Sequence, residues 1–404
     1  MKKYNSNLTF TFPVTPEDDA AWREFPDTKS RLEACEMDSG TLEEISTFNL
    51  LQAVLSHPFL VDFYSFNNPD DGFAYLRKVF NGADEFFSRE DTVPAAEEAL
   101  AELSEEDAYD NLKRRILLYY LKWFPRKSLS YSKAKTKSPM GNDIEVFIFD
   151  EEFTQSEKDS IAKRFKAARP QIEVISEATS TYNCHSYAWY NSSSQWNHYW
   201  MNYPTTYMSD GSYTKIPAIN QCINRDIIYY GTPGEEHSGV LLSKPSGGFH
   251  VLSKWGKGPL ILHDINDCPY STANLSYYRC NYNKGYVTVI NNWGVTLDEL
   301  CIRHRRGNNK DLEDVTNCLS IKNNTESIQV LTFYYQNGFG APFDYWWIKF
   351  KIAGGKEYKI KDNFFCNITK DDDGTATLTI DGDSEKLNVS FSQSSSDSTS
   401  IIAV

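Results

Sequence analysis

The stretch Thr181-Tyr-Asn-Cys-His-Ser-Tyr-Ala-Trp189 is the part of the sequence that says most about fold and function. Its lone cysteine, Cys184, stands where a short helix is expected to begin, since Ser186-Tyr-Ala-Trp-Tyr190 suits first helical turns. The partial positive charge of a helix N-terminus favours a thiolate. Further along, His237 opens an apolar run that predicts a strand. A cysteine opening a helix and a histidine opening a strand together indicate a nucleophile and its base.

Three segments carry a resemblance to a known family. Asn183-Cys-His-Ser-Tyr-Ala188 resembles the nucleophile helix of the NlpC/P60 and CHAP papain-like superfamily. Asn224-Arg-Asp-Ile-Ile-Tyr-Tyr230 and His237-Ser-Gly-Val-Leu241 are similar to two of its strands, the second of which carries the histidine base. Members are mostly peptidoglycan endopeptidases or amidases, and some are acyltransferases or hydrolases of other amides. The resemblance covers roughly residues 140–282 and implies that Cys184 is the nucleophile and His237 the base.

The third polar residue of the family is expected on the strand that follows the Gly247-Gly248 turn. Ser253-Lys254 stands there, where the family usually shows His, Glu, Asn or Gln. Successive residues of a strand face opposite sides, so only one of these two can point at His237. We expect Ser253 to orient His237.

Lys254 stays open as an alternative orienting residue, and so do two histidines. His250 or His263 takes this role if the strand register differs by one or two residues. A metal site built from the histidines of this region lacks regular ligand spacing, so we expect no metal and no other cofactor. The residues expected to contact substrate are Tyr182, Asn183, Trp196, Trp200, Trp255 and His263.

The periodicity of the chain predicts a multidomain protein with three parts. Residues 1–125 show helical periodicity, with helices expected near 41–57, 69–80, 94–103 and 108–123, and predict an α-helical N-terminal domain. Residues 126–282 are expected to form the papain-like α+β domain. The basic, serine-rich segment of about 125–140 suits a linker. Residues 283–404 contain short alternating runs separated by Asn, Gly and Asp turns, which predict an all-β, antiparallel sandwich.

The composition limits the partners. A net charge of −14 argues against nucleic acid as the main partner. The sequence has no apolar run of 18 or more residues, so we expect no membrane span. The expected partner is a peptide or peptidoglycan-like substrate, and Tyr345-Trp-Trp347 suits a glycan ligand of the C-terminal domain.

The resemblance also bears on location. It implies a secreted or cell-surface protein, although no apolar signal segment follows Met1-Lys-Lys3. Residues 49–60 and 80–82 resemble helical leaders of secreted proteins from gut-type bacteria. In an exported protein, disulfides are plausible for Cys268 with Cys280 or for Cys301 with Cys318; eight scattered thiols are the alternative.

Two functions follow from these observations. The first is a cysteine hydrolase, a peptidase or amidase, that cleaves cell-wall peptides or similar amides through Cys184 and His237. The alternative is a protein with a papain-like fold that has lost turnover and serves as a secreted binding or adhesion module through its β-sandwich. The missing family residue at Ser253-Lys254 favours the alternative.

Overall fold

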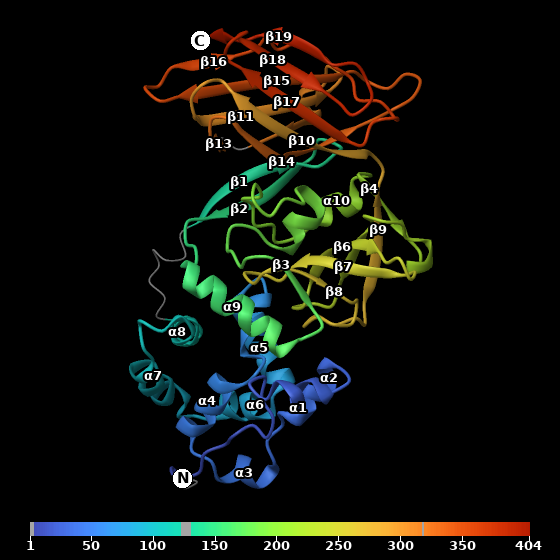
Figure 1. The fold of residues 1–404 in the computed structure, drawn as a ribbon. Helices are drawn as coiled ribbons and strands as arrows, with labels where there is room; N and C mark the ends of the chain where they lie inside the picture. Colours follow the sequence, from blue (N-terminus) through green and yellow to red (C-terminus); the bar gives the residue numbers. More distant parts are fainter. Residues whose placement is uncertain (1–3, 123–130, 317–318) are drawn as a thin grey trace.

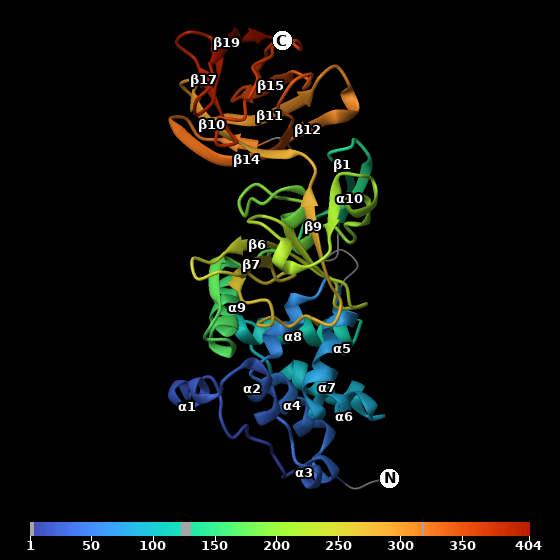
Figure 2. The ribbon, with the colours of Figure 1, turned by 90° about the vertical axis from the view of Figure 1, so that its right-hand side faces the viewer.

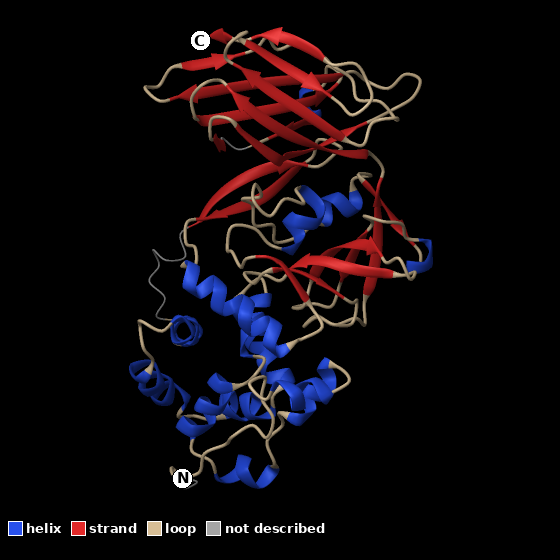
Figure 3. Ribbon diagram, viewed as in Figure 1, coloured by secondary structure: helices blue, strands red, loops and turns tan. Residues whose placement is uncertain are grey.

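The computed structural model describes residues 4–122, 131–316 and 319–404, and shows a multidomain α+β protein (Figures 1 and 3). Helices gather at the N-terminal end of the molecule and strands at the C-terminal end. The helices of the first 122 residues are α1 (Asp19–Glu24), α2 (Thr28–Ala34), α3 (Ser39–Glu44), α4 (Thr47–Ser56), η1 (Leu60–Ser65), α5 (Pro69–Val79), α6 (Asn81–Ser88), α7 (Thr92–Glu102) and α8 (Ala108–Tyr120).

Side-chain caps decide where several of these helices begin. The helix expected from about residue 41 is in fact two helices, because Ile45 has extended backbone angles. The Asp38 carboxylate caps α3 by accepting the Thr41 N–H, and the Ser46 hydroxyl caps α4 by accepting the Asn49 N–H. Each cap satisfies an N–H that a helix start leaves without a partner.

The middle of the chain is built around a seven-stranded antiparallel sheet with strand order β3-β8-β7-β6-β5-β9-β4. A two-stranded hairpin, two α-helices and two short helical turns accompany it. The elements in chain order are β1 (Tyr131–Lys137), β2 (Asp143–Phe149), α9 (Gln155–Ala168), β3 (Glu173–Ser176), η2 (Ser186–Tyr190), α10 (Thr205–Ser209), β4 (Tyr213–Ile216), η3 (Ile219–Gln221), β5 (Ile227–Tyr230), β6 (His237–Ser243), β7 (Phe249–Lys254), β8 (Leu260–His263) and β9 (Leu275–Cys280).

The linker predicted over about 125–140 is wrong for its second half. Residues 131–137 form β1, which pairs with β2 along its whole length, from Tyr131 opposite Phe149 to Lys137 opposite Asp143. The ion pairs of Lys135 and Lys137 with Asp143 explain how a basic segment forms a strand here. Residues 125–130 of the predicted linker lie outside the described residues.

Two packed sheets form the C-terminal part, as the alternating pattern predicted (Figure 2). One sheet has the order β14-β10-β17-β18-β19 and the other β12-β11-β15-β16-β20, with β13 paired to β11. The pairing of β10 with β17 is parallel, which corrects the expectation of a fully antiparallel sandwich. The elements are β10 (Asn283–Asn292), β11 (Leu297–Arg306), η4 (Lys310–Leu312), β12 (Glu313–Val315), β13 (Leu319–Ile321), β14 (Thr325–Tyr335), β15 (Asp344–Ile352), β16 (Glu357–Lys359), β17 (Thr375–Asp381), β18 (Lys386–Ser390), β19 (Asp397–Ser400) and β20 (Ile402–Ala403).

The sandwich has its own hydrophobic core, whereas the N-terminal helices share theirs with the middle sheet. Val289 of one sandwich sheet and Ile348 of the other belong to one buried cluster. Leu55 of α4, Phe165 of α9 and Leu241 of β6 belong to another. The predicted boundary near residue 125 is therefore crossed by a continuous core, while the boundary at 282/283 falls between β9 and β10.

A buried ion pair lies inside the shared core. Asp62 of η1 accepts two hydrogen bonds of 2.6 Å from Arg169, the residue after α9, and both side chains are 0% exposed. The Tyr75 hydroxyl donates a third bond to Asp62, at 2.8 Å. Burial alone would lower the pKa of Arg169, but Asp62 raises it above its ordinary value. This pair joins the helical region to the middle sheet.

The disulfide expectations are settled in part. Cys268 and Cys280 are both free, so their predicted pairing is wrong. Cys301 is disulfide-bonded, whereas Cys318 lies outside the described residues. Within the part of the chain that the structure describes, no helix has both the length and the apolar composition needed to cross a membrane.

We predict that Arg169→Met lowers the free energy of unfolding by about 3–5 kcal/mol, because a buried carboxylate that loses its partner keeps its desolvation cost. Denaturant unfolding followed by circular dichroism measures this change. The matched control is Arg77→Met, which removes the solvent-exposed pair of Arg77 with Asp84 and is expected to cost less than about 1 kcal/mol. Equal losses in the two variants would contradict a special role for the buried pair.

Candidate functional site

Cys184 lies at the start of the helix that leads into η2, as the sequence predicted, but its thiol is sealed. The residue is 1% exposed. Burial raises the pKa of the Cys184 thiol to about 12, and the backbone N–H groups of Ser238 and His185 only partly oppose this. The thiol is therefore protonated at neutral pH in this arrangement, and a protonated thiol is a poor nucleophile.

His237 opens β6, also as predicted, yet it does not form the expected pair with Cys184. Its ring stacks on the Tyr270 ring with centroids 3.7 Å apart and lies 5.5 Å from the Tyr230 ring. Neither ring nitrogen of His237 has a hydrogen-bond partner. Burial lowers the pKa of His237 well below its ordinary value, and His263 and His185 add to this effect. The imidazole is thus neutral and is not oriented by any hydrogen bond.

The next residue, Ser238, is the one whose side chain meets the helix. Its hydroxyl oxygen accepts a hydrogen bond of 2.9 Å from the indole N–H of Trp189. The same oxygen forms a hydrogen bond of 2.8 Å with Nδ1 of His185. Because side chains alternate along a strand, this contact turns His237 to the opposite face of the sheet. Sequence reasoning missed this polar triplet of Ser238, His185 and Trp189, because no motif reveals it.

Ser253, the predicted orienting residue, bonds a different histidine. His263 donates through Nδ1 to the carbonyl of Asp264, at 2.8 Å, so its Nε2 accepts the Ser253 hydroxyl proton at 2.8 Å. Ser253 in turn accepts the indole N–H of Trp255, at 3.1 Å. The hydroxyl is therefore fully used, and the prediction that it orients His237 is wrong. Trp255 and His263 are buried in this cluster, which corrects their expected contact with substrate.

Lys254 lies on the helix-facing side of β7 and is completely buried. Its ammonium donates to the carbonyls of Thr179 and Gly256, at 2.9 and 2.7 Å, and stands 5.0 Å above the centre of the Tyr182 ring. Burial lowers the pKa of Lys254 to about 7, against smaller raising effects of Glu152 and Cys184. Of the orienting residues left open by the sequence, Lys254 is thus the one that interacts electrostatically with the thiol. His250 is at the surface, 2.9 Å from Asp264.

Of the remaining residues predicted to contact substrate, three pack inside the protein and one lines a cavity. Tyr182 and Asn183 are fully buried, and the Asn183 amide bonds the carbonyls of Met201 and of the Asn67 side chain. Trp196 packs against the core of the sandwich, which corrects its placement in a substrate cleft. Trp200 lines a cavity, as expected of a contact residue.

This cavity, called the aromatic pocket below, has a volume of about 140 Å³ and lies between η1, the end of β2 and the Trp200 loop. Its Asn67 side chain accepts the hydrogen bond from Asn183, so the pocket borders the residue before Cys184. A cavity of about 150 Å³ holds one six-membered ring. The lining residues are Phe63, Tyr64, Phe66, Asn67, Asn68, Pro69, Tyr119, Phe149, Trp200 and Lys257.

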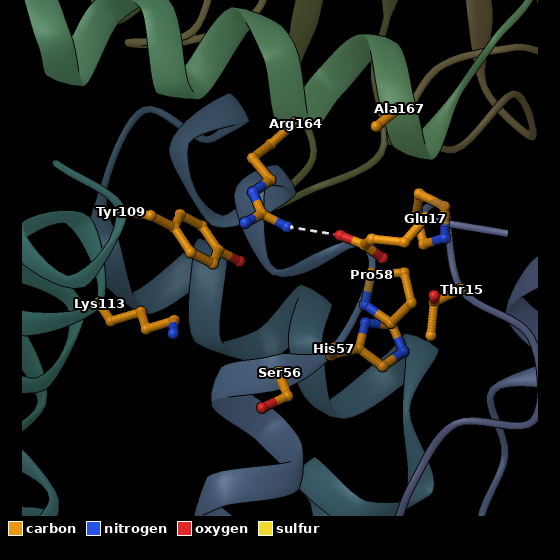
Figure 4. A pocket seen from close by; sticks show the side chains of 10 residues that line it. Thr15, Glu17, Ser56, His57, Pro58, Tyr109, Lys113, Arg164 and Ala167 are labelled. Atoms are coloured by element: carbon orange, nitrogen blue, oxygen red, sulfur yellow. Dashed lines mark hydrogen bonds and ion pairs between the residues drawn. The ribbon is translucent and has the colours of Figure 1, made fainter. Parts of the chain in front are cut away.

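A second cavity, of about 220 Å³, lies between the N-terminal arm, the end of α4 and α9 (Figure 4). An ion pair of Glu17 with Arg164, 3.2 Å long, spans it. The Arg164 guanidinium also stands 3.9 Å above the centre of the Tyr109 ring. The third charged residue of the lining, Lys113, forms an ion pair of 3.2 Å with Asp110. Each charged group of the cavity is therefore already paired, so we assign no ligand to it.

No protein-family model matches the chain, and a search of curated proteins finds no match either. Among the residues described, no group of three or more His, Cys, Asp or Glu side chains is placed to hold a metal ion. The functional argument therefore depends on the geometry around Cys184 and on the aromatic pocket.

We predict that iodoacetamide at pH 8 modifies Cys184 at least about 100-fold more slowly than Cys222, because Cys184 is 1% exposed whereas Cys222 is partly exposed. Burial raises the pKa of both thiols, to about 12 for Cys184 and about 11 for Cys222, so the difference in rate comes mainly from access to the sulfur. Peptide mass spectrometry after timed labelling gives both rates in one sample. In denaturant the two rates are expected to converge. Fast labelling of Cys184 near pH 7 that disappears in His237→Ala would show instead that the two residues form a reactive pair.

A second prediction concerns the buried ammonium. Burial moves the pKa of Lys254 from 10.5 to about 7, so between these values the unfolded chain binds a proton that the folded chain does not. Stability linked to Lys254 therefore rises with pH, by at most about 1.4 kcal/mol per pH unit. We expect the free energy of unfolding, measured in urea between pH 7.5 and 8.5, to rise more steeply in the parent than in Lys254→Met. Parallel pH dependences would contradict the lowered pKa.

Proposed function

We propose that the middle part of the chain has a papain-like fold of the NlpC/P60 and CHAP kind and that it binds peptides without cleaving them. What supports the fold is a helix that begins at Cys184 and packs its Ser186–Tyr190 turn on strands β6 and β7 of an antiparallel sheet, with His237 as the first residue of β6. The observation that carries the function is the contrast between a sealed thiol and the neighbouring aromatic pocket. By the same resemblance, the protein is secreted or displayed at a cell surface.

The absence of turnover follows from the state of the two expected catalytic groups. A cysteine hydrolase needs a thiolate and a base that is within hydrogen-bonding reach and held by a third group. Here the Cys184 thiol is protonated, and His237 has no hydrogen bond to either ring nitrogen. Ser253 is committed to His263 and Trp255 and cannot hold His237.

The chemistry of the aromatic pocket favours a peptide ligand with an aromatic or large apolar side chain. Phe63 and Phe66 form buried walls, and Phe149 stands edge-on to Trp200 with centroids 5.4 Å apart. Such walls accept a ring in edge-to-face contact. At the rim, the Asn68 side chain accepts the Asp71 N–H as the cap of α5 and donates to the Asp71 carboxylate, so the aromatic walls are what select the ligand.

The second candidate is the cysteine hydrolase, in which Lys254 takes the part of the activating group. One observation favours it: Lys254 and the Cys184 thiol interact electrostatically, and the pKa of Lys254 is lowered to about 7, which suits a base at neutral pH. This candidate requires the helix start to move, because both groups are buried.

We predict that acetyl-Ala-Phe-Ala-amide binds more tightly than acetyl-Ala-Ser-Ala-amide, and that Phe149→Ala weakens the first by about tenfold by removing a ring of the pocket. Isothermal titration calorimetry on the full chain measures both affinities. Phe339→Ala, which removes a fully exposed ring of the sandwich, is the matched control and leaves the affinity unchanged. Cys184→Ser is also expected to bind normally, because the pocket does not use the thiol.

The same peptides separate the two candidates when they are followed by mass spectrometry for cleavage. Binding without cleavage supports the binding function. Cleavage that is lost in Cys184→Ser and in Lys254→Met, but retained in Ser253→Ala, would establish the hydrolase. The same result would overturn the binding function. Equal affinity for the two peptides would overturn the assignment of the aromatic pocket.

A further inference from the structure

A larger cavity, called the junction groove below, lies where the middle sheet meets the sandwich. Its volume is about 560 Å³. Arg279 of β9, Lys284 of β10 and Gln329 of β14 all line it, so both sheets and the connection between them contribute. Figure 2 shows β9 running up to the sandwich at this level. None of the residues placed at the Cys184 site takes part in lining it, so the groove is a separate site.

The junction groove is basic although the protein as a whole is strongly acidic. Three basic side chains and two carboxylates line it, against a net charge of −14 for the chain. Asp226 is already held by two hydrogen bonds from Arg279, of 3.0 and 2.7 Å. The other carboxylate, Asp373, is exposed and accepts the backbone N–H of Thr375.

Two of the basic groups in the groove have no carboxylate partner among the described residues. The Arg225 guanidinium is held by the Tyr286 hydroxyl, at 2.7 Å, and not by a carboxylate. The Lys284 ammonium stands 5.7 Å from the centre of the Tyr334 ring and interacts with the Cys280 thiol. Burial lowers the pKa of Lys284; among the smaller effects, Cys280 raises it and Arg225 lowers it. Bringing an anion to these two groups would relieve their mutual repulsion.

Backbone strain is also concentrated at the groove. Arg225 has a φ of 72° and Gln329 a φ of 54°, and both side chains line the cavity. Residues other than glycine seldom adopt positive φ, and such strain gathers at sites where a side chain must be aimed. Gln329 lies where the register of β14 against β10 shifts, so a bulge turns this residue toward the groove.

The rest of the lining matches a ligand rich in hydroxyl groups. Asn224, Asn283 and Thr375 offer amide and hydroxyl groups, and Tyr282 and Tyr286 offer aromatic faces. We propose that the junction groove binds an acidic carbohydrate of about two sugar units, with Arg225 and Lys284 receiving its carboxylate and the amides receiving its hydroxyls. Arginine and lysine beside neutral hydrogen-bonding groups are the recognition elements that such a ligand requires.

The test is calorimetric titration of the full chain with digalacturonic acid, a two-unit uronic acid, and with the neutral disaccharide lactose. We expect digalacturonic acid to bind and lactose to bind at least about tenfold more weakly, with an affinity for the acid that falls as salt rises. Lys284→Gln is expected to weaken the acid by about tenfold or more, because a charge-assisted hydrogen bond is lost. Lys361→Gln, at an exposed lysine outside the groove, is the matched control and leaves the affinity unchanged.

A second variant guards against a folding defect in the first. Tyr286→Phe removes only the hydroxyl that holds Arg225, and it is expected to weaken the acid severalfold while thermal unfolding stays as in the parent. Digalacturonic acid that does not bind, or that binds Lys284→Gln as well as the parent, would overturn the proposal. Inorganic phosphate that binds as tightly as the acid and displaces it would overturn the carbohydrate assignment.

Discussion

The bidentate pair of Asp62 with Arg169 is the contact on which the arrangement of the first two thirds of the chain depends. The two residues are 107 positions apart and both are completely buried. Arg169 also stands 4.9 Å from the centre of the Phe59 ring and 5.3 Å from that of Trp255, so it touches both sides of the junction it closes. A buried charge tolerates little displacement of its partner, since the loss of either bond leaves a desolvated ion. The helical region and the middle sheet are therefore held in one fixed position relative to each other.

This fixed position explains why the aromatic pocket lies beside the buried Cys184 thiol. The backbone N–H of Lys257, just after β7, donates to the Tyr64 carbonyl of η1, at 2.8 Å. This bond brings η1 against the loop that carries Lys257 and leaves the aromatic pocket between them. The same approach places Tyr270 over His237, because the Tyr270 hydroxyl donates to the Ser65 carbonyl at 2.7 Å. The contact that builds the pocket thus also covers the imidazole.

Local patterns in the sequence predicted elements well, and failed where a contact joins distant parts of the chain. The helix at Cys184, the strand at His237 and the C-terminal sandwich each follow from a short periodic run, and the structure contains them. The prediction that His237 of β6 faces the Cys184 helix was wrong. Ser238 faces it instead, because a shift of one residue along a strand exchanges the two faces. Nothing within residues 237–243 distinguishes these two registers. The choice is made by Trp189 and Tyr270, which come from other elements.

The same limit explains why the sequence showed the Cys184 region and hid the junction groove. A cysteine at a helix start is encoded by adjacent residues, so a local motif reveals it whatever the distant contacts around it are. The groove has no motif, because Arg225, Lys284 and Gln329 come from separate segments that meet only when the sandwich docks. Among the hydrogen bonds that dock the sandwich, two come from β14: the Tyr334 hydroxyl donates to the Trp189 carbonyl, at 3.1 Å, and the Thr332 hydroxyl donates to Asn191, at 2.9 Å. Because Trp189 belongs to the helix that Cys184 begins, that helix positions the sandwich as well as the sheet beneath it. The helix that begins at Cys184 thus has a structural role that does not depend on its thiol.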